Sequence, residues 1–305
     1  MTPLRPRGAP TGKSPAAALR AGPRRAWWRA RCARVGRQWG SPPRPRSAPG
    51  RGGLGGGRVA PAWGAEVVSS NIVGYQKVNL RAGFNLVASQ FLLVGGETKD
   101  IQDYVEADNT MPGLDENGSF QTTMRVWTGT GYSTYGWLNA TDGTANEVPE
   151  WNSKWVLEDS SDLADVDMNV GDGYWVICSE AATATFAGEV PSTDGNPSVS
   201  VSQGFNLIAN PLPADINIQN IQPSASLLGL DENGSFQTTM RVWTGTGYST
   251  YGWLDADDGT ANEVPEWNSK WVLEDSSDLA NVTVGIGEGF WLISPSASGS
   301  VSFIK

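Results

Sequence analysis

Short alternations of apolar and polar residues dominate the chain from about residue 82 onward. Phe84, Leu86 and Ala88 alternate with polar or smaller neighbours, which predicts a half-buried strand. Ile101 and Tyr104 then follow with the spacing of one helical face, so a turn or two of helix is expected there. This pattern indicates short strands joined by tight turns, with little helix.

A hairpin is the clearest element of the pattern. Residues 115–118 (Asp-Glu-Asn-Gly) form a predicted turn that leads into a strand over 122–128. The pair Gly129-Thr130 predicts a tight turn, and 131–138 the returning strand. The sequence therefore places Trp127 opposite Tyr132.

Further strands are expected toward the end of the same segment. Trp155 and Leu157 open one strand after a polar loop, and residues 174–177 and 183–186 read as a closing hairpin. A set of short strands of this kind is typical of a small sandwich or barrel. The predicted fold class is all-β with minor short helices, built as β-sandwich or barrel-like domains.

The chain contains an internal repeat. Residues 113–164 recur as 229–280, and across these 52 positions only Asn139 (Asp255 in the second copy) and Thr141 (Asp257) differ. The period is too long for common solenoids and propellers, so two domains are expected. We place the copies at 66–191 and 198–305, with a linker dense in turn residues at 192–197.

Residues 1–65 have a different composition from the rest. They are rich in Arg, Pro and Gly and contain no acidic residue, so a disordered basic leader is predicted. No apolar run of secretory-signal length occurs in them. A basic nucleic-acid arm is an alternative; a mis-assigned start, upstream of a true signal-peptide end near 62–65, is the reading we favour.

Charge and cysteine content exclude several classes. From Glu66 on there are 8 basic and 32 acidic side chains, a balance of −24, which argues against nucleic acid as a partner. No stretch approaches the length of a transmembrane segment. Cys32 and Cys178 lie on opposite sides of the composition break, so no disulfide framework is expected, and Cys178 is predicted to be buried.

The sequence lacks the residues of most catalytic sites. It has no histidine, which removes Ser-His-Asp and Cys-His sites and the usual zinc ligand sets, and no phosphate-binding glycine loop. A carboxylate glycosidase is the remaining enzymatic alternative. Its candidate acids are Glu147, Glu150 and Glu158, with Glu263, Glu266 and Glu274 in the second copy. We expect no catalytic residue and no required cofactor.

A cation site is a second candidate. Asp255, Asp257, Asp258 and Glu263 supply oxygen ligands around a Gly turn and could hold Ca²⁺ in the second copy. The first copy lacks two of these charges, and an acidic surface turn is the competing interpretation.

An aromatic platform is the third candidate. One face of the predicted hairpin carries Arg125, Trp127 and Tyr132, and the second copy repeats them as Arg241, Trp243 and Tyr248. Such a face could stack on sugar rings. The alternative is that this face is buried against the sister domain. Trp151, Trp155, Trp267 and Trp271 add aromatics on or near the polar loop.

An ordered set of segments carries a family resemblance. These are 204–212 (Gly-Phe-Asn-Leu-Ile-Ala-Asn-Pro-Leu), the Val242-Trp243 to Tyr248 segment, 287–291 and 301–303. Together with 70–75 they resemble uncharacterised exported β-repeat proteins of planctomycete and verrucomicrobial bacteria. The resemblance implies secretion or display at the cell surface and carries over no activity.

Two functions are therefore expected to compete. The first is a non-catalytic structural or adhesive module that contacts other envelope proteins. The second is a carbohydrate-binding module that uses the Trp/Tyr platforms on a polysaccharide, where two sites would add avidity.

Overall fold

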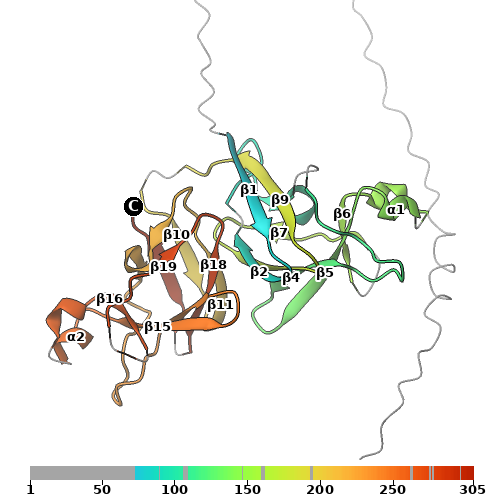
Figure 1. The fold of residues 1–305 in the computed structure, drawn as a ribbon. Helices are drawn as coiled ribbons and strands as arrows, with labels where there is room; N and C mark the ends of the chain where they lie inside the picture. Colours follow the sequence, from blue (N-terminus) through green and yellow to red (C-terminus); the bar gives the residue numbers. More distant parts are fainter. Residues whose placement is uncertain are drawn as a thin grey trace, which may run out of the picture. The chain divides into compact units, whose positions relative to one another are not determined.

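The computed structural model describes most of the chain from residue 73 onward. It covers residues 73–305 apart from 89, 106–108, 146, 159–161, 193–194, 262–263, 275, 277 and 296. The predictions made for residues 1–65 lie outside the described residues. The part after Ala65 forms one compact unit, and the strands of the two sequence copies make up separate groups in it (Figure 1).

The first sequence copy (66–191) is called repeat 1 and the second (198–305) repeat 2. The described part of repeat 1 contains strands β1 to β9, two short 3₁₀ turns and one short helix. Their bounds are β1 Val73–Leu80, β2 Gly83–Ala88, β3 Lys99–Asp100, η2 Ile101–Asp103, β4 Thr122–Trp127, β5 Tyr132–Leu138, α1 Asp142–Ala145, η3 Pro149–Trp151, β6 Lys154–Leu157, β7 Asp167–Met168, β8 Gly173–Cys178 and β9 Ala182–Glu189.

Repeat 2 contains strands β10 to β19 and the equivalents of the same short helical elements. Their bounds are β10 Ser198–Val201, β11 Gly204–Ala209, β12 Ile216–Asn217, η4 Ile218–Asn220, β13 Ile221–Pro223, β14 Thr239–Trp243, β15 Tyr248–Leu254, α2 Asp258–Ala261, η5 Pro265–Trp267, β16 Lys270–Leu273, β17 Thr283–Val284, β18 Gly289–Ser294 and β19 Gly299–Phe303.

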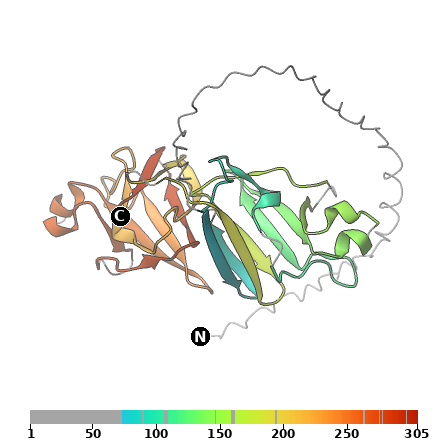
Figure 2. The same cartoon turned by 90° about the horizontal axis from the view of Figure 1, so that it is seen from above.

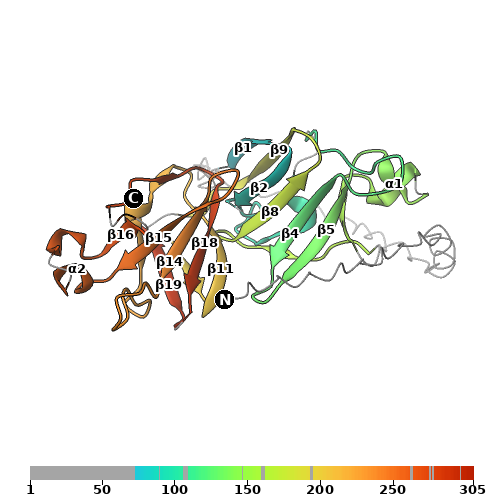
Figure 3. The same ribbon diagram turned by 60° about the horizontal axis from the view of Figure 1, so that its bottom comes forward.

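Each repeat is built on one five-stranded antiparallel sheet. The strand order is β2-β8-β4-β5-β6 in repeat 1 and β11-β18-β14-β15-β16 in repeat 2 (Figure 3). A smaller sheet lies against each, β1-β9 in the first repeat and β10-β19-β13 in the second. The all-β prediction with minor short helices is confirmed, and in the described part of the chain the sheets do not close into a barrel.

A separate apolar core fills each repeat between its large and small sheets. In repeat 1 it joins Met124 and Trp155 of the large sheet to Phe186 of β9. In repeat 2 Met240 and Trp271 meet Phe303 of β19 in the same way. Burying large side chains such as these is the main source of stability for a small domain. Cys178 lies in the first core, as predicted, and is a free thiol.

A glutamine in the short 3₁₀ turn ties that turn to the sheet in both repeats. The Gln102 side-chain nitrogen donates to the carbonyls of Trp155 (2.7 Å) and Ala164 (2.8 Å), and its oxygen accepts from the Trp155 amide (3.0 Å). Gln219 repeats these bonds with Trp271 and Ala280. The helix expected around Ile101 and Tyr104 is thus a single turn, and both side chains are buried.

The expected closing hairpin is wrong. β8 lies between β2 and β4 in the large sheet, whereas β9 pairs with β1 from Val73↔Glu189 to Leu80↔Ala182. The connection between β8 and β9 therefore crosses from one layer of the sandwich to the other. This places Trp175 of β8 opposite Arg125 of β4, in the middle of the sheet.

The half-buried strand predicted at Phe84 is also wrong in part. In β2 the residues from Asn85 to Ala88 are all buried. Val87 enters the core of repeat 1, while Leu86 on the other face packs against repeat 2. A strand covered on both faces loses the polar alternation that a one-sided strand needs.

The two repeats contact each other through equivalent surfaces. Val87 of repeat 1 bridges to Glu288 of repeat 2, and Asp172 of repeat 1 bridges to Ile208 of repeat 2. Val87 and Ile208 occupy the same place in β2 and β11, so the two bridges are exchanged by swapping the repeats. This is the pattern of an isologous, two-fold interface, here formed within one chain.

Two glycines allow this close approach. A Cβ atom on Gly173 would lie 3.2 Å from Cγ of Leu207, and one on Gly289 would lie 3.0 Å from Cγ of Leu86. Both distances are tighter than normal packing of a side chain allows. A glycine at this position in each repeat therefore leaves room for a leucine side chain of the other repeat.

The short helices α1 and α2 lie in their own repeats beside β6 and β16 and apart from this contact, as the second view also shows (Figure 2). Among the described residues, no helix has the length and apolar character needed to cross a membrane.

Candidate functional site

The hairpin that carries the predicted platform has the expected register. Trp127 pairs with Tyr132 and Arg125 with Thr134, and in repeat 2 Trp243 pairs with Tyr248. The Trp127 and Tyr132 rings contact edge to face at 5.1 Å, and the Trp243 and Tyr248 rings at 5.0 Å. The opposite face, with Met124 and Tyr135, enters the core of repeat 1.

The tryptophans of this face contact the other repeat. Trp127 meets Trp291 of repeat 2 at 5.2 Å, and Trp243 of repeat 2 meets Trp175 of repeat 1 at 5.5 Å, both edge to face. Leu86 and Leu207 complete this inter-repeat cluster. Edge-to-face contacts between aromatic rings are favourable beyond the area they bury. Trp127 and Trp243 are therefore half-buried and do not form a free surface.

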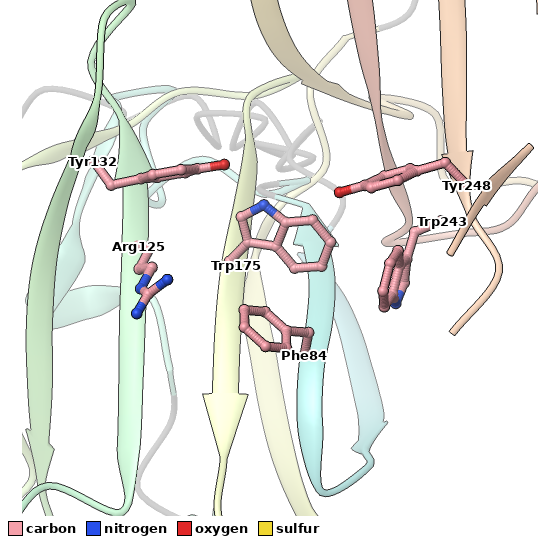
Figure 4. A pocket seen from close by; sticks show the side chains of 6 residues that line it. All are labelled: Phe84, Arg125, Tyr132, Trp175, Trp243 and Tyr248. Carbon is pink, nitrogen blue, oxygen red and sulfur yellow. The ribbon is translucent and has the colours of Figure 1, made fainter. Parts of the chain in front are cut away.

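Two equivalent hollows open beside the inter-repeat cluster. The first holds about 200 Å³ and is lined by Phe84, Arg125, Tyr132, Trp175, Trp243 and Tyr248 (Figure 4). The second holds about 290 Å³ and is lined by Phe205, Arg241, Tyr248, Trp291, Trp127 and Tyr132. Exchanging the repeats converts one list into the other. All six residues of the sequence-predicted platform line these two hollows.

The exposed aromatic surface of the hollows comes from Phe and Tyr. Phe84 and Phe205 are 46% and 49% exposed, and Tyr132 and Tyr248 are 42% and 43% exposed. Phe84 stands edge-on to Trp175 at 5.8 Å, and Phe205 stands edge-on to Trp291 at 5.9 Å. Each hollow thus presents a phenyl ring and two phenol rings over a base of indoles.

The two tyrosines belong to both hollows. Their hydroxyls point inward from opposite sides, above Trp175 in the close-up (Figure 4). The indole of Trp291 donates a hydrogen bond to the Tyr248 hydroxyl (3.3 Å), and Trp175 and Tyr132 occupy the equivalent places at the first hollow. Burial raises the pKa of the Tyr132 hydroxyl further above pH 7, at which a phenol with its ordinary pKa is already neutral and can donate.

One arginine lines each hollow. Arg125 lies on β4 with its guanidinium carbon 6.0 Å from the centre of the Phe84 ring, at the outer limit of a cation–π contact. Its Nε atom is buried and has no hydrogen-bond partner. Arg241 occupies the equivalent place on β14 and is exposed.

Sequence reasoning missed four lining residues, Phe84, Trp175, Phe205 and Trp291. The two tryptophans lie on β8 and β18, which the false hairpin placed outside the platform. A signal was available, since Tyr174 and Val176 alternate toward the core and so leave Trp175 on the face that carries Arg125. Phe84 could be found in the same way, as the residue paired with Ile177.

The other aromatics of the polar loop do not add to the platform. Trp155 and Trp271 are fully buried in the two repeat cores, against Trp137 and Trp253 respectively. Trp151 and Trp267 end the 3₁₀ turns η3 and η5 and are half-buried.

No carboxylate lines either hollow among the residues described. The glycosidase candidates Glu147, Glu150, Glu158, Glu266 and Glu274 are exposed, and Glu263 lies outside the described residues. A glycosidase needs two facing carboxylates at the substrate. The hollows are lined by aromatic rings, phenol hydroxyls and one arginine each, groups that can bind a ligand.

The acidic turn at the proposed cation site binds backbone amides. Asp258 Oδ2 accepts from the amides of Leu230 (2.8 Å) and Asp255 (3.0 Å), and Asp255 Oδ1 accepts from the Asp257 amide (3.0 Å). In the described part of the chain no group of three or more His, Cys, Asp or Glu is placed to hold an ion. The Ca²⁺ site with Asp255, Asp257, Asp258 and Glu263 stays a prediction from sequence.

Asp142, the equivalent carboxylate in repeat 1, also accepts hydrogen bonds from backbone amides. Asp142 Oδ2 accepts from the amides of Leu114 and Asn139, both at 2.9 Å. We expect Asp142→Ala and Asp258→Ala to lower the free energy of unfolding equally, by about 1.5–3 kcal/mol, because each leaves two amides without a charged acceptor. Urea unfolding with and without Ca²⁺ measures this. A Ca²⁺-dependent gain in stability that Asp258→Ala alone removes would contradict the structural role and support a cation site.

Comparison of the chain with protein-family models, with curated proteins and with solved structures gives no match. The function is therefore inferred from the fold and from the two hollows.

Proposed function

We propose that this protein is a non-catalytic carbohydrate-binding module whose two equivalent hollows each receive a sugar ring. The observation that carries the proposal is that the two hollows are lined by equivalent sets of six residues, one set the repeat-exchanged copy of the other. Two of the equivalent positions, Phe84/Phe205 and Trp175/Trp291, lie outside the nearly identical part of the repeat, where the two copies are only partly alike. Their agreement supports a shared role for the hollows.

The chemistry of the lining suits a saccharide. Exposed phenyl and phenol rings can stack on the apolar faces of a sugar, and hydroxyl and guanidinium groups can bond to its oxygens. The volumes lie below the roughly 300–1,000 Å³ of sites for drug-sized ligands, so a single ring suits each hollow better than a large molecule. Two hollows on one chain would give a polysaccharide an avidity gain.

A structural or adhesive module remains the second candidate. The half-buried Trp127 and Trp243 support it, because part of the aromatic face holds the repeats together. Under this proposal the partner is another envelope protein. In both cases we place the protein outside the cell or at its surface, supported by the strongly acidic body and by the family resemblance. Detection of the natural protein only in the cytoplasm would overturn that location.

The carbohydrate proposal predicts that either tyrosine matters at both hollows. We expect Tyr132→Ala or Tyr248→Ala alone to weaken binding at both sites, by at least about tenfold, because each ring lines both hollows. The measurement is a calorimetric titration of the full chain with neutral and acidic oligosaccharides. Tyr75→Ala is the matched control, since Tyr75 is 64% exposed and lies on β1 outside both hollows. Absence of saturable binding across the panel would favour the adhesive module.

A further inference from the structure

No ion pair joins Arg125 or Arg241 of the hollows to a carboxylate among the described residues. The Arg125 Nε atom is buried without a hydrogen-bond partner, and Arg241 is exposed. From Glu66 onward acidic side chains outnumber basic ones by 32 to 8, so a pairing carboxylate would be easy to supply. Two of these eight cations lie in the hollows, one in each.

An unpaired guanidinium beside aromatic rings is costly to keep. Arg125 is half-buried and its Nε has lost contact with solvent, and the Phe84 ring centre lies 6.0 Å from its guanidinium carbon. Taking part of a charge out of water is unfavourable unless a partner is provided. A ligand that brings an acceptor group offsets this cost at Arg125, whereas Arg241 is exposed and its guanidinium is directly accessible to such a ligand.

We propose that each hollow binds a sugar unit of the uronic-acid type, which carries one carboxylate. This carboxylate would bind Arg125 in the first hollow and Arg241 in the second. A planar guanidinium matches a carboxylate with two parallel hydrogen bonds. One arginine serves each hollow, and the body carries a strong negative charge that disfavours a ligand of higher charge. This inference rests on the proposed carbohydrate function and adds the charge of the ligand to it.

The test uses the full chain and short oligosaccharides of galacturonate, glucuronate and mannuronate, each with its methyl ester as the neutral counterpart. Calorimetry is expected to show at least one acid form binding about 10- to 100-fold more tightly than its ester, because a hydrogen bond to a charged partner is lost in the ester. Arg125→Gln with Arg241→Gln should remove this preference, and the two Lys variants should restore part of it.

Lys154→Gln with Lys270→Gln is the matched control. These residues begin β6 and β16 and line neither hollow, and the pair changes the net charge by the same amount. It should leave the preference for the acid form intact. Circular dichroism of every variant checks that it is folded.

The possible outcomes distinguish failure of the uronate assignment from failure of the carbohydrate-binding function. Equal binding of acid and ester overturns the anionic assignment and leaves the carbohydrate function standing, whereas no binding of any form overturns both. Tighter binding of sulfated sugars than of uronates overturns the carboxylate. Residues 1–65 carry 14 basic side chains, so acid-selective binding that survives Arg125→Gln with Arg241→Gln belongs to them and also overturns the proposal.

Discussion

Trp175→Ala and Trp291→Ala are each expected to lower the free energy of unfolding by about 3–5 kcal/mol, the usual cost of removing a large buried aromatic side chain. Both side chains lie in the inter-repeat cluster and are 5% and 8% exposed. Because the two occupy equivalent places, the losses should be similar. Total stabilities of domains are only about 5–15 kcal/mol, so either variant changes the protein substantially.

The same variants should also loosen the coupling between the repeats. Each repeat has its own core, and the inter-repeat cluster contributes most of the apolar contact between them. Urea unfolding followed by fluorescence and circular dichroism should therefore become two-step or lose slope. The Tyr75→Ala control should shift stability by less than about 0.5 kcal/mol. A loss below about 1 kcal/mol with one unchanged transition would show that the repeats do not depend on this contact.

Trp271→Ala is expected to cost a similar amount, about 3–5 kcal/mol, through the core of repeat 2. Trp271 and its equivalent Trp155 are both fully buried, but they differ in one bond. The Trp271 indole donates to the carbonyl of Ile221 (2.7 Å), whereas the buried Trp155 indole has no partner. The two residues therefore form a matched pair for the value of that bond.

Phenylalanine variants isolate the difference. Trp271→Phe should cost about 1 kcal/mol more than Trp155→Phe, because only the former removes a hydrogen bond while both remove similar volume. The readout is urea unfolding of the two variants side by side. Equal costs, or a larger cost at Trp155, would contradict this explanation.

The register of the platform hairpin could be predicted because local chemistry determines it. A two-residue Gly-Thr turn between alternating strands leaves one pairing that buries Met124 and Tyr135 together. The resulting placement of Trp127 beside Tyr132 needed no long-range information.

The completion of each hollow could not be predicted in the same way. A short link between β8 and β9 reads as a hairpin, yet the two strands belong to different sheets. The contact between the repeats could not be predicted either, because Trp127 and Trp243 show the same local pattern whether they face water or the other repeat. The Asp258 turn resembles a cation loop in sequence because orphan amides and cations both favour a carboxylate oxygen.

Binding of a ligand in both hollows is tested most directly by the indole N–H signals of ¹⁵N-labelled protein. During titration with the tightest-binding oligosaccharide, the signals of Trp127, Trp175, Trp243 and Trp291 should shift and saturate together. Those of the buried Trp155, Trp253 and Trp271 should stay in place, because these side chains line neither hollow. Shifts confined to other tryptophans, or none at saturating ligand, would contradict binding in the hollows.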